Sequence, residues 1–117
     1  MISVHEPSPV TPPQPPYYAV VFVSTRTSID GAAYERAAEA MADLASRQPG
    51  YLGMDSARGA DGLGITVSYW RDEKSIAAWR DHVEHAAARH RGRESWYSCF
   101  ALHVARVERS YGFPVHG

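Results

Sequence analysis

An apolar run of ten residues, YYAVVFVSTR from Tyr17 to Arg26, constrains the fold more than any other feature of this sequence. The run is rich in aromatic and β-branched residues, which is typical of a β-strand that is buried on both faces. Large apolar side chains occupy both parities of this strand: Tyr18, Val20 and Phe22 on one, Ala19, Val21 and Val23 on the other. Each face of a sheet that contains this strand therefore needs a cover.

Two segments have the periodicity of amphipathic helices. The first follows Asp30, whose carboxylate can accept the free N–H groups of the first turn, and it stops at the QPG sequence of residues 48–50. The second follows Asp72 in the same way and stops at Gly92. Apolar or small residues share one face of each helix: Tyr34, Ala37, Ala38, Met41, Leu44 and Ala45 in the first, and Ile76, Trp79, Val83 and Ala86 in the second, where His90 falls on the same face.

Three further segments have strand patterns: YLGMDSARG from Tyr51, LGITVSYW from Leu63 to Trp70, and WYSCFALHVARVERSY up to Tyr111. In LGITVSYW, Leu63, Ile65, Val67 and Tyr69 point to one side, while Thr66, Ser68 and Trp70 point to the other. The order is β-α-β-β-α-β, which predicts an α+β, ferredoxin-like fold with a four-stranded antiparallel sheet and two helices on one face. Because the sheet face without helices would leave apolar side chains exposed to water, we expect a homodimer that pairs sheet to sheet.

The chain of 117 residues is long enough for one domain, which we place at residues 17–113. Residues 1–16 hold most of the eight prolines, and we expect them to form an extended or disordered tail that contributes little to stability. A proline-rich ligand for a partner protein is the alternative reading of this tail. Residues 114–117 form a short C-terminal tail.

Composition excludes several classes of protein. A net charge of −1 does not suit a chain that coats nucleic acid. The single cysteine, Cys99, cannot form an intrachain disulfide, and no apolar run approaches the length of a membrane span. Since the N-terminus also lacks a signal-peptide pattern, we expect a cytoplasmic protein that binds neither nucleic acid nor membrane.

Residues 79–97 concentrate histidine and arginine between aromatic residues. His82 and His85 are spaced i, i+3 on one side of the predicted helix, but two ligands do not complete a zinc site, so we predict no metal. His90 instead falls on the apolar side that carries Trp79. There it is either a hydrogen-bonded core residue or a base that lines a pocket.

Several aromatic residues could frame a cleft between the helices and the sheet, or pack as ordinary core: Tyr69, Trp70, Trp79, Tyr97 and Phe100. His103 shares the parity of Tyr97 on the last strand. It lines either that cleft or the dimer interface, depending on which sheet face this parity occupies.

The segments PGYLG and GITVSYW, the latter followed by a tryptophan nine residues after Trp70, resemble the antibiotic biosynthesis monooxygenase (ABM) superfamily. The resemblance extends over residues 17–113 and is closest to a widespread, little-characterised bacterial branch. It implies a dimeric α+β barrel. Two chemistries occur in this superfamily: oxidation of aromatic polyketides to quinones without a cofactor, and haem degradation.

The haem-degrading branch uses an asparagine on the first strand, a tryptophan on the second helix and a histidine nine or ten residues later. Trp79 matches the helix tryptophan, and Trp70 matches the aromatic residue that ends the third strand. The chain contains no asparagine, and Ala88 and Arg89 stand where the histidine is expected. His85 comes too early for that position and His90 slightly too late.

The resemblance therefore implies an oxygenase that acts with O2 on a small aromatic or polycyclic phenol, without a metal or another cofactor. We expect Trp79 to form a wall of the cavity and His90 or His85 to act as the base. The candidates for substrate binding are Trp70, Tyr69, Tyr97, Phe100 and His103. A haem-binding or haem-degrading protein and a non-catalytic dimer that binds a small molecule or a partner are the alternatives.

Overall fold

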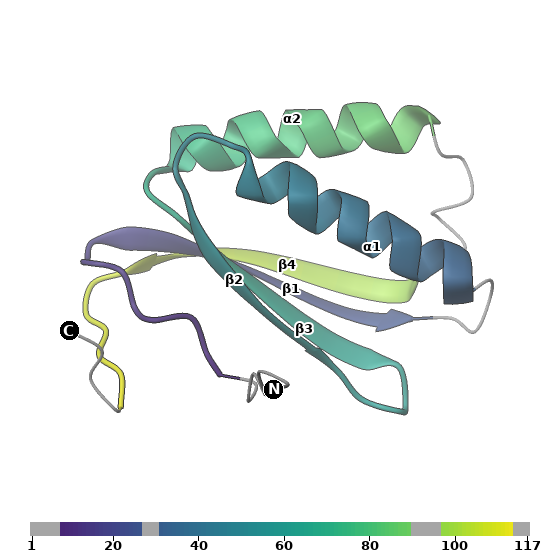
Figure 1. Ribbon diagram of the computed structural model, residues 1–117, viewed down its shortest axis with the longest axis horizontal. Coiled ribbons are helices and arrows are strands. Elements are labelled where there is room, and N and C mark those ends of the chain that lie inside the picture. The colour runs from purple at the N-terminus through teal and green to yellow at the C-terminus, as the bar shows by residue number, and fades with distance from the viewer. Residues whose placement is uncertain (1–7, 27–30, 90–96, 114–117) are drawn as a thin grey trace, which may run out of the picture.

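The computed structural model describes residues 8–26, 31–89 and 97–113, and for residues 31–38, 83–89 and 97–99 it describes the backbone alone. The elements are β1 (Tyr17–Arg26), α1 (Gly31–Ser46), β2 (Tyr51–Arg58), β3 (Leu63–Trp70), α2 (Glu73–Arg89) and β4 (Tyr97–Val107). This order confirms the predicted ferredoxin-like α+β fold, although β4 ends at Val107 and not at Tyr111. Both helices lie on one side of the sheet (Figure 1).

The sheet is antiparallel, with the strand order β2-β3-β1-β4. Its register aligns four rows of residues on the side that faces the helices. Listed from β2 through β3 and β1 to β4, the rows are Tyr51–Trp70–Tyr18–Arg106, Met54–Ser68–Val20–Val104, Ser56–Thr66–Phe22–Leu102 and Arg58–Gly64–Ser24–Phe100. We call them rows one to four. The predicted parity of β3 is confirmed, because Trp70 and Ser68 face the helices.

The core lies over rows one and two. Val20 and Trp70 from the sheet pack with Ala45 of α1 and Ile76 of α2, and Trp70 is fully buried. Burying these apolar side chains is the main force that holds the helices on the sheet. Rows three and four have less cover, since Phe100 remains 65 % exposed and Leu102 51 % exposed. The helix-facing side is thus packed at one end and open along β4 at the other.

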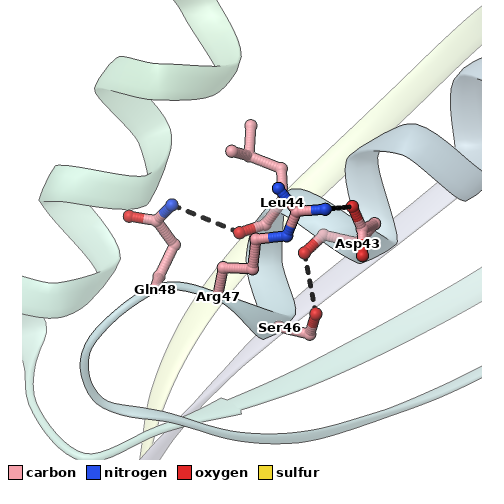
Figure 2. A network of polar contacts seen from close by, with 5 residues as sticks. All are labelled: Asp43, Leu44, Ser46, Arg47 and Gln48. Atoms are coloured by element: carbon pink, nitrogen blue, oxygen red, sulfur yellow. Dashed lines mark hydrogen bonds and ion pairs between the residues drawn. The ribbon is translucent and has the colours of Figure 1, made fainter.

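Local hydrogen bonds end and begin the helices. Figure 2 shows the end of α1, where Gln48 Nε2 donates to the Leu44 carbonyl (3.2 Å) and Ser46 Oγ donates to the Asp43 carbonyl (2.7 Å), while Arg47 pairs with Asp43. These bonds satisfy carbonyl groups that have no partner within the helix.

At the start of α2, Asp72 Oδ1 accepts the Ser75 N–H (2.8 Å), which confirms the predicted cap. Hydrogen bonds from Ser75 hold the pKa of Asp72 below its ordinary value. The predicted cap at Asp30 and the predicted stop at Gly92 lie outside the described residues.

Residues 8–16 form neither helix nor strand, but they dock on the sheet face away from the helices. We call this segment the strap and that face the open face. The Val10 N–H donates to Asp55 Oδ1 (2.9 Å), and the Val10 side chain lies against Gly53, where a Cβ would stand 2.8 Å from Val10 Cγ1. Figure 1 shows residues 8–16 and the described segment after β4 on the side of the sheet opposite the helices. The strap therefore contributes packing that its proline content did not predict.

None of the helices in the described part of the chain is long and apolar enough to cross a membrane.

Candidate functional site

A groove opens on the helix-facing side, between α2 and the edge strand β4. It has a volume of about 260 Å³, and its lining comprises Glu73, Ile76, Ala77, Arg80 and Val104. The four α2 residues are spaced i, i+3, i+4 and i+7, so they form one side of the helix. Ile76, Ala77 and Val104 are apolar, whereas Glu73 and Arg80 are charged and exposed. The groove therefore suits an apolar molecule that carries a polar edge.

The exposed side chains of β4 extend the floor of this groove. Val104, Leu102 and Phe100 point to the same side of the sheet and are 47 %, 51 % and 65 % exposed. The Phe100 ring packs against the Phe22 ring, with the ring centres 5.5 Å apart. Such a strip of exposed apolar groups is more typical of a binding surface than of an ordinary protein surface.

Aromatic rings fill the inner end of the site. Trp70 contacts the edge of Tyr51 (5.5 Å between ring centres) and lies beside Trp79 of α2 (5.3 Å). Burial, and to a smaller extent the charge of Asp55, raises the pKa of Tyr51. Tyr51 is thus a neutral phenol at physiological pH, which can donate a hydrogen bond but does not act as a base.

The two tryptophans differ in how their indole N–H groups are satisfied. Trp70 Nε1 donates to Ser68 Oγ (2.8 Å), which is itself buried. Trp79 Nε1 is buried as well, but it has no acceptor in the described part of the protein. A buried donor without a partner costs about 1–3 kcal/mol, so it is a position where a bound molecule could gain a hydrogen bond.

Arg58 fixes a positive charge at the far end of the floor. Its side chain crosses Gly64, where a Cβ would stand 2.5 Å from Arg58 Cζ, and Arg58 Nη2 donates to Ser24 Oγ (2.7 Å). Arg58 Nη1 donates to the Ser24 carbonyl (3.2 Å) and to the Gly62 carbonyl. Only glycine leaves room for the Arg58 side chain to cross the strand at this point. A glycine paired with an arginine in neighbouring strands is therefore the sequence pattern that indicates this arrangement. The sequence did not predict a place in the site for four residues: Arg58, Arg80, Leu102 and Val104.

The structure brings two of the aromatic candidates, Trp70 and Trp79, into contact. Phe100 also faces the helices, but it lies in row four at the other end of the sheet and packs on Phe22. The structure places Tyr69 and His103 on the open face instead. Tyr69 donates its hydroxyl to Asp55 Oδ2 (2.9 Å) and contacts Tyr17 edge-on, and His103 is exposed opposite Val21. Burial, the hydrogen bond to Asp55, the charge of Asp55 and the influence of Tyr17 raise the pKa of Tyr69 to about 12.

The remaining candidates fall where side chains are not described. The backbone of His85 belongs to α2 and that of Tyr97 to β4, whereas His90 lies outside the described residues altogether. The described part of the chain contains no group of three or more His, Cys, Asp or Glu side chains that could hold a metal ion. Among the described side chains, no histidine reaches the helix-facing side as a ligand for haem iron, because His82 is exposed on α2 and His103 lies on the other face.

Comparison with known proteins agrees with this architecture. The family model of the antibiotic biosynthesis monooxygenases matches residues 16–91. The uncharacterised protein YqjZ of Bacillus subtilis is 52 % identical over 97 residues, which are 83 % of this chain and 84 % of that protein.

Two solved structures show the same fold at low sequence identity. SnoaB, a cofactor-independent oxygenase from Streptomyces nogalater, has a TM-score of 0.67 and 16 % identity over 86 % of this chain and 100 % of its own. A variant of MhuD with two manganese protoporphyrin IX molecules in each active site has a TM-score of 0.64 and 20 % identity over 81 % of this chain and 98 % of its own. The family match and the YqjZ similarity each extend over most of the chain, and the family match supports a function of the monooxygenase type. The chain belongs to the antibiotic biosynthesis monooxygenase family.

Proposed function

We propose that this protein is an oxygenase that oxidises a small aromatic or polycyclic phenol with O2 and needs no metal or other cofactor. The main support for the proposal is the apolar groove along β4, which shares Ile76 with the cluster that contains Trp70 and packs against Trp79. The buried Trp79 N–H has no acceptor in the described residues. Membership of the monooxygenase family gives the reaction type, and SnoaB is an example of a family fold that works without a cofactor.

The reaction balances without an external reductant. The phenol first loses its proton to a base, and the phenolate then donates electrons to O2. One oxygen atom enters the ring, and the other leaves as water with two hydrogen atoms from the substrate, so the phenol becomes a quinone. The phenol is oxidised by four electrons, and O2 takes up all four.

Three parts of the site serve this reaction in our proposal. The apolar side chains of the groove and its floor hold the ring system and keep water away from it: Ile76, Ala77, Val104 and Leu102. The Trp79 N–H donates to the substrate oxygen, where negative charge develops. His85 or His90 takes the phenol proton, because an imidazole has a pKa suited to proton transfer near neutral pH.

In our proposal, Arg58 does not act on the reacting phenol, because its guanidinium is held on Ser24 in row four while the groove lies at Val104 in row two. It binds an acidic group of a substrate that is long enough to extend from the groove over Leu102 and Phe100 to row four.

Oxygen uptake by the purified protein tests the proposal. Naphthols, anthrones and hydroquinones are supplied in air-saturated buffer with a metal chelator, and uptake is compared with that of heat-denatured protein. We expect uptake with a polycyclic phenol, and a drop of at least about tenfold in kcat/KM for His85→Gln or His90→Gln, whichever carries the base. Haem titration of the same sample provides the opposing outcome, because a shifted Soret band that decays under a reductant and air would favour the haem alternative.

We also propose that the protein is a homodimer that pairs through the open face, and that it acts in the cytoplasm. The apolar character of that face supports the first part of this proposal, since Leu63 and Ile65 are 49 % and 46 % exposed.

A further inference from the structure

The groove carries opposite charges at its two ends. α2 begins beside the end of β3, at row one, and runs back over the sheet toward row four (Figure 1). Glu73 therefore lies at the row-one end of the groove, and Arg80 lies about 10 Å further along the helix, at the end toward row four. The lining between them is apolar, with Ile76 and Ala77 on the helix and Val104 on the strand.

The Arg80 guanidinium is available to a bound molecule. Its side chain is exposed, and it forms no ion pair within the described residues, where the ion pairs join Arg47 to Asp43 and Arg106 to Glu108. A guanidinium keeps its charge at physiological pH, and its planar set of N–H donors matches the two oxygen atoms of a carboxylate. Arg80 can therefore bind an anionic group at the mouth of the groove.

The floor on the row-four side of the groove favours the same direction. Leu102 and Phe100 continue the apolar floor from Val104 toward row four, where the Arg58 guanidinium is held on Ser24. None of the residues that form rows three and four is an Asp or a Glu. An anionic group thus meets positive charge toward row four and the carboxylate of Glu73 at the other end, which it repels.

We propose that Glu73 and Arg80 make the groove selective for aromatic acids and orient them, with the anionic group at Arg80. The inference rests on the proposed function, in which the groove holds the ring system, and it narrows the substrate class. The substrate is an elongated aromatic compound with a phenol at one end and a carboxylate at the other. A two-ring acid ends at Arg80, whereas a longer one extends to Arg58.

Isothermal titration calorimetry with two matched compounds tests the selectivity. 6-Hydroxy-2-naphthoate carries a hydroxyl and a carboxylate at opposite ends of two fused rings, and 6-hydroxy-2-naphthamide has the same shape without the charge. At low ionic strength, where exposed charges are least screened, the native protein should bind the naphthoate more tightly than the amide. Added salt should reduce this preference.

Substitutions at the two ends of the groove should change the preference in opposite directions. Arg80→Gln should weaken naphthoate binding by about three- to fivefold and leave the amide nearly unchanged, whereas Arg80→Lys, which keeps the charge, should retain most of the preference. Glu73→Gln should tighten naphthoate binding, because it removes the repelling carboxylate. Since Glu73 also lies in the first turn of α2, circular dichroism and the melting temperature of each variant check that the fold is intact.

Lys74→Gln is the matched control. Lys74 is an exposed cation on the same helix but does not line the groove, so its loss should leave both dissociation constants within about twofold. The inference is overturned if the native protein binds the amide as tightly as the naphthoate, or if Arg80→Gln weakens both compounds alike. It is equally overturned if Lys74→Gln weakens the naphthoate as much as Arg80→Gln does.

Oxygen uptake by the same samples separates this inference from the proposed reaction. Charge-selective binding without oxygen uptake would support the inference and contradict the reaction. If neither compound binds, the groove is not a site for aromatic rings, and both proposals fail.

Discussion

At the scale of single residues, the two tryptophans of the site have opposite energetic roles. The Trp70 indole is fully buried and its N–H is satisfied by Ser68, whereas the Trp79 N–H has no acceptor in the described structure. We expect Trp70→Phe to cost about 1–3 kcal/mol more than Trp79→Phe, because it leaves a buried hydroxyl unpaired and a gap in the core. Chemical denaturation of the two variants measures this difference. Equal losses would mean that Trp79 is also hydrogen-bonded in the folded protein.

Tyr69 provides a second test at this scale, through its raised pKa of about 12. Since the folded pKa lies above the ordinary value of 10.0, the stability that Tyr69 contributes is fully present below about pH 10 and is lost as the pH rises through 12. In a spectrophotometric titration, one tyrosine should ionise near pH 12, and Asp55→Ala should bring that step down. A titration curve that Asp55→Ala leaves unchanged would contradict the assigned bond.

At the scale of elements, the strap is the segment whose contribution the sequence pattern missed. Its anchor joins Val10 to Asp55, and the Val10 side chain packs against Gly53. Deletion of residues 1–16 should therefore lower the melting temperature by several degrees, because apolar surface and a carboxylate lose their partners. Asp55→Ala should reproduce part of the loss, while Ser56→Ala, whose side chain faces the helices, should not. If the truncated chain has the same melting temperature as the full-length protein, the strap does not stabilise the fold.

The sequence predicted what depends on local periodicity. The strand and helix order, the parity of β3 and the Asp72 cap follow from residues that are close together in the chain, and the structure confirms them. The strap could not be predicted in the same way, since its anchor joins residues that are 45 positions apart.

The face of His103 also could not be predicted from its parity on β4 alone. It depends on how β4 aligns with β1, and the register between these strands shifts at Thr25/Arg26. Tyr69 was predicted to be on the side opposite Trp70, but only the packed helices identify which of the two sides carries the groove.

At the scale of the whole molecule, the two sides of the sheet have separate tasks. The helix-facing side carries the groove, the tryptophans and Arg58, while the open face carries the strap and the proposed dimer contact. Substitutions on one side should therefore change either turnover or association, and not both. Leu63→Gln, for example, should weaken the dimer while each protomer keeps its groove intact.

The proposed reaction is tested most directly by a turnover experiment under ¹⁸O2 with a phenol that the protein consumes, in buffer with a metal chelator and no added cofactor. We expect one ¹⁸O atom in each quinone and the other in water, with one O2 consumed per quinone formed. Quinone oxygen that carries no label, or hydrogen peroxide formed in step with the product, would contradict a monooxygenase reaction in this groove.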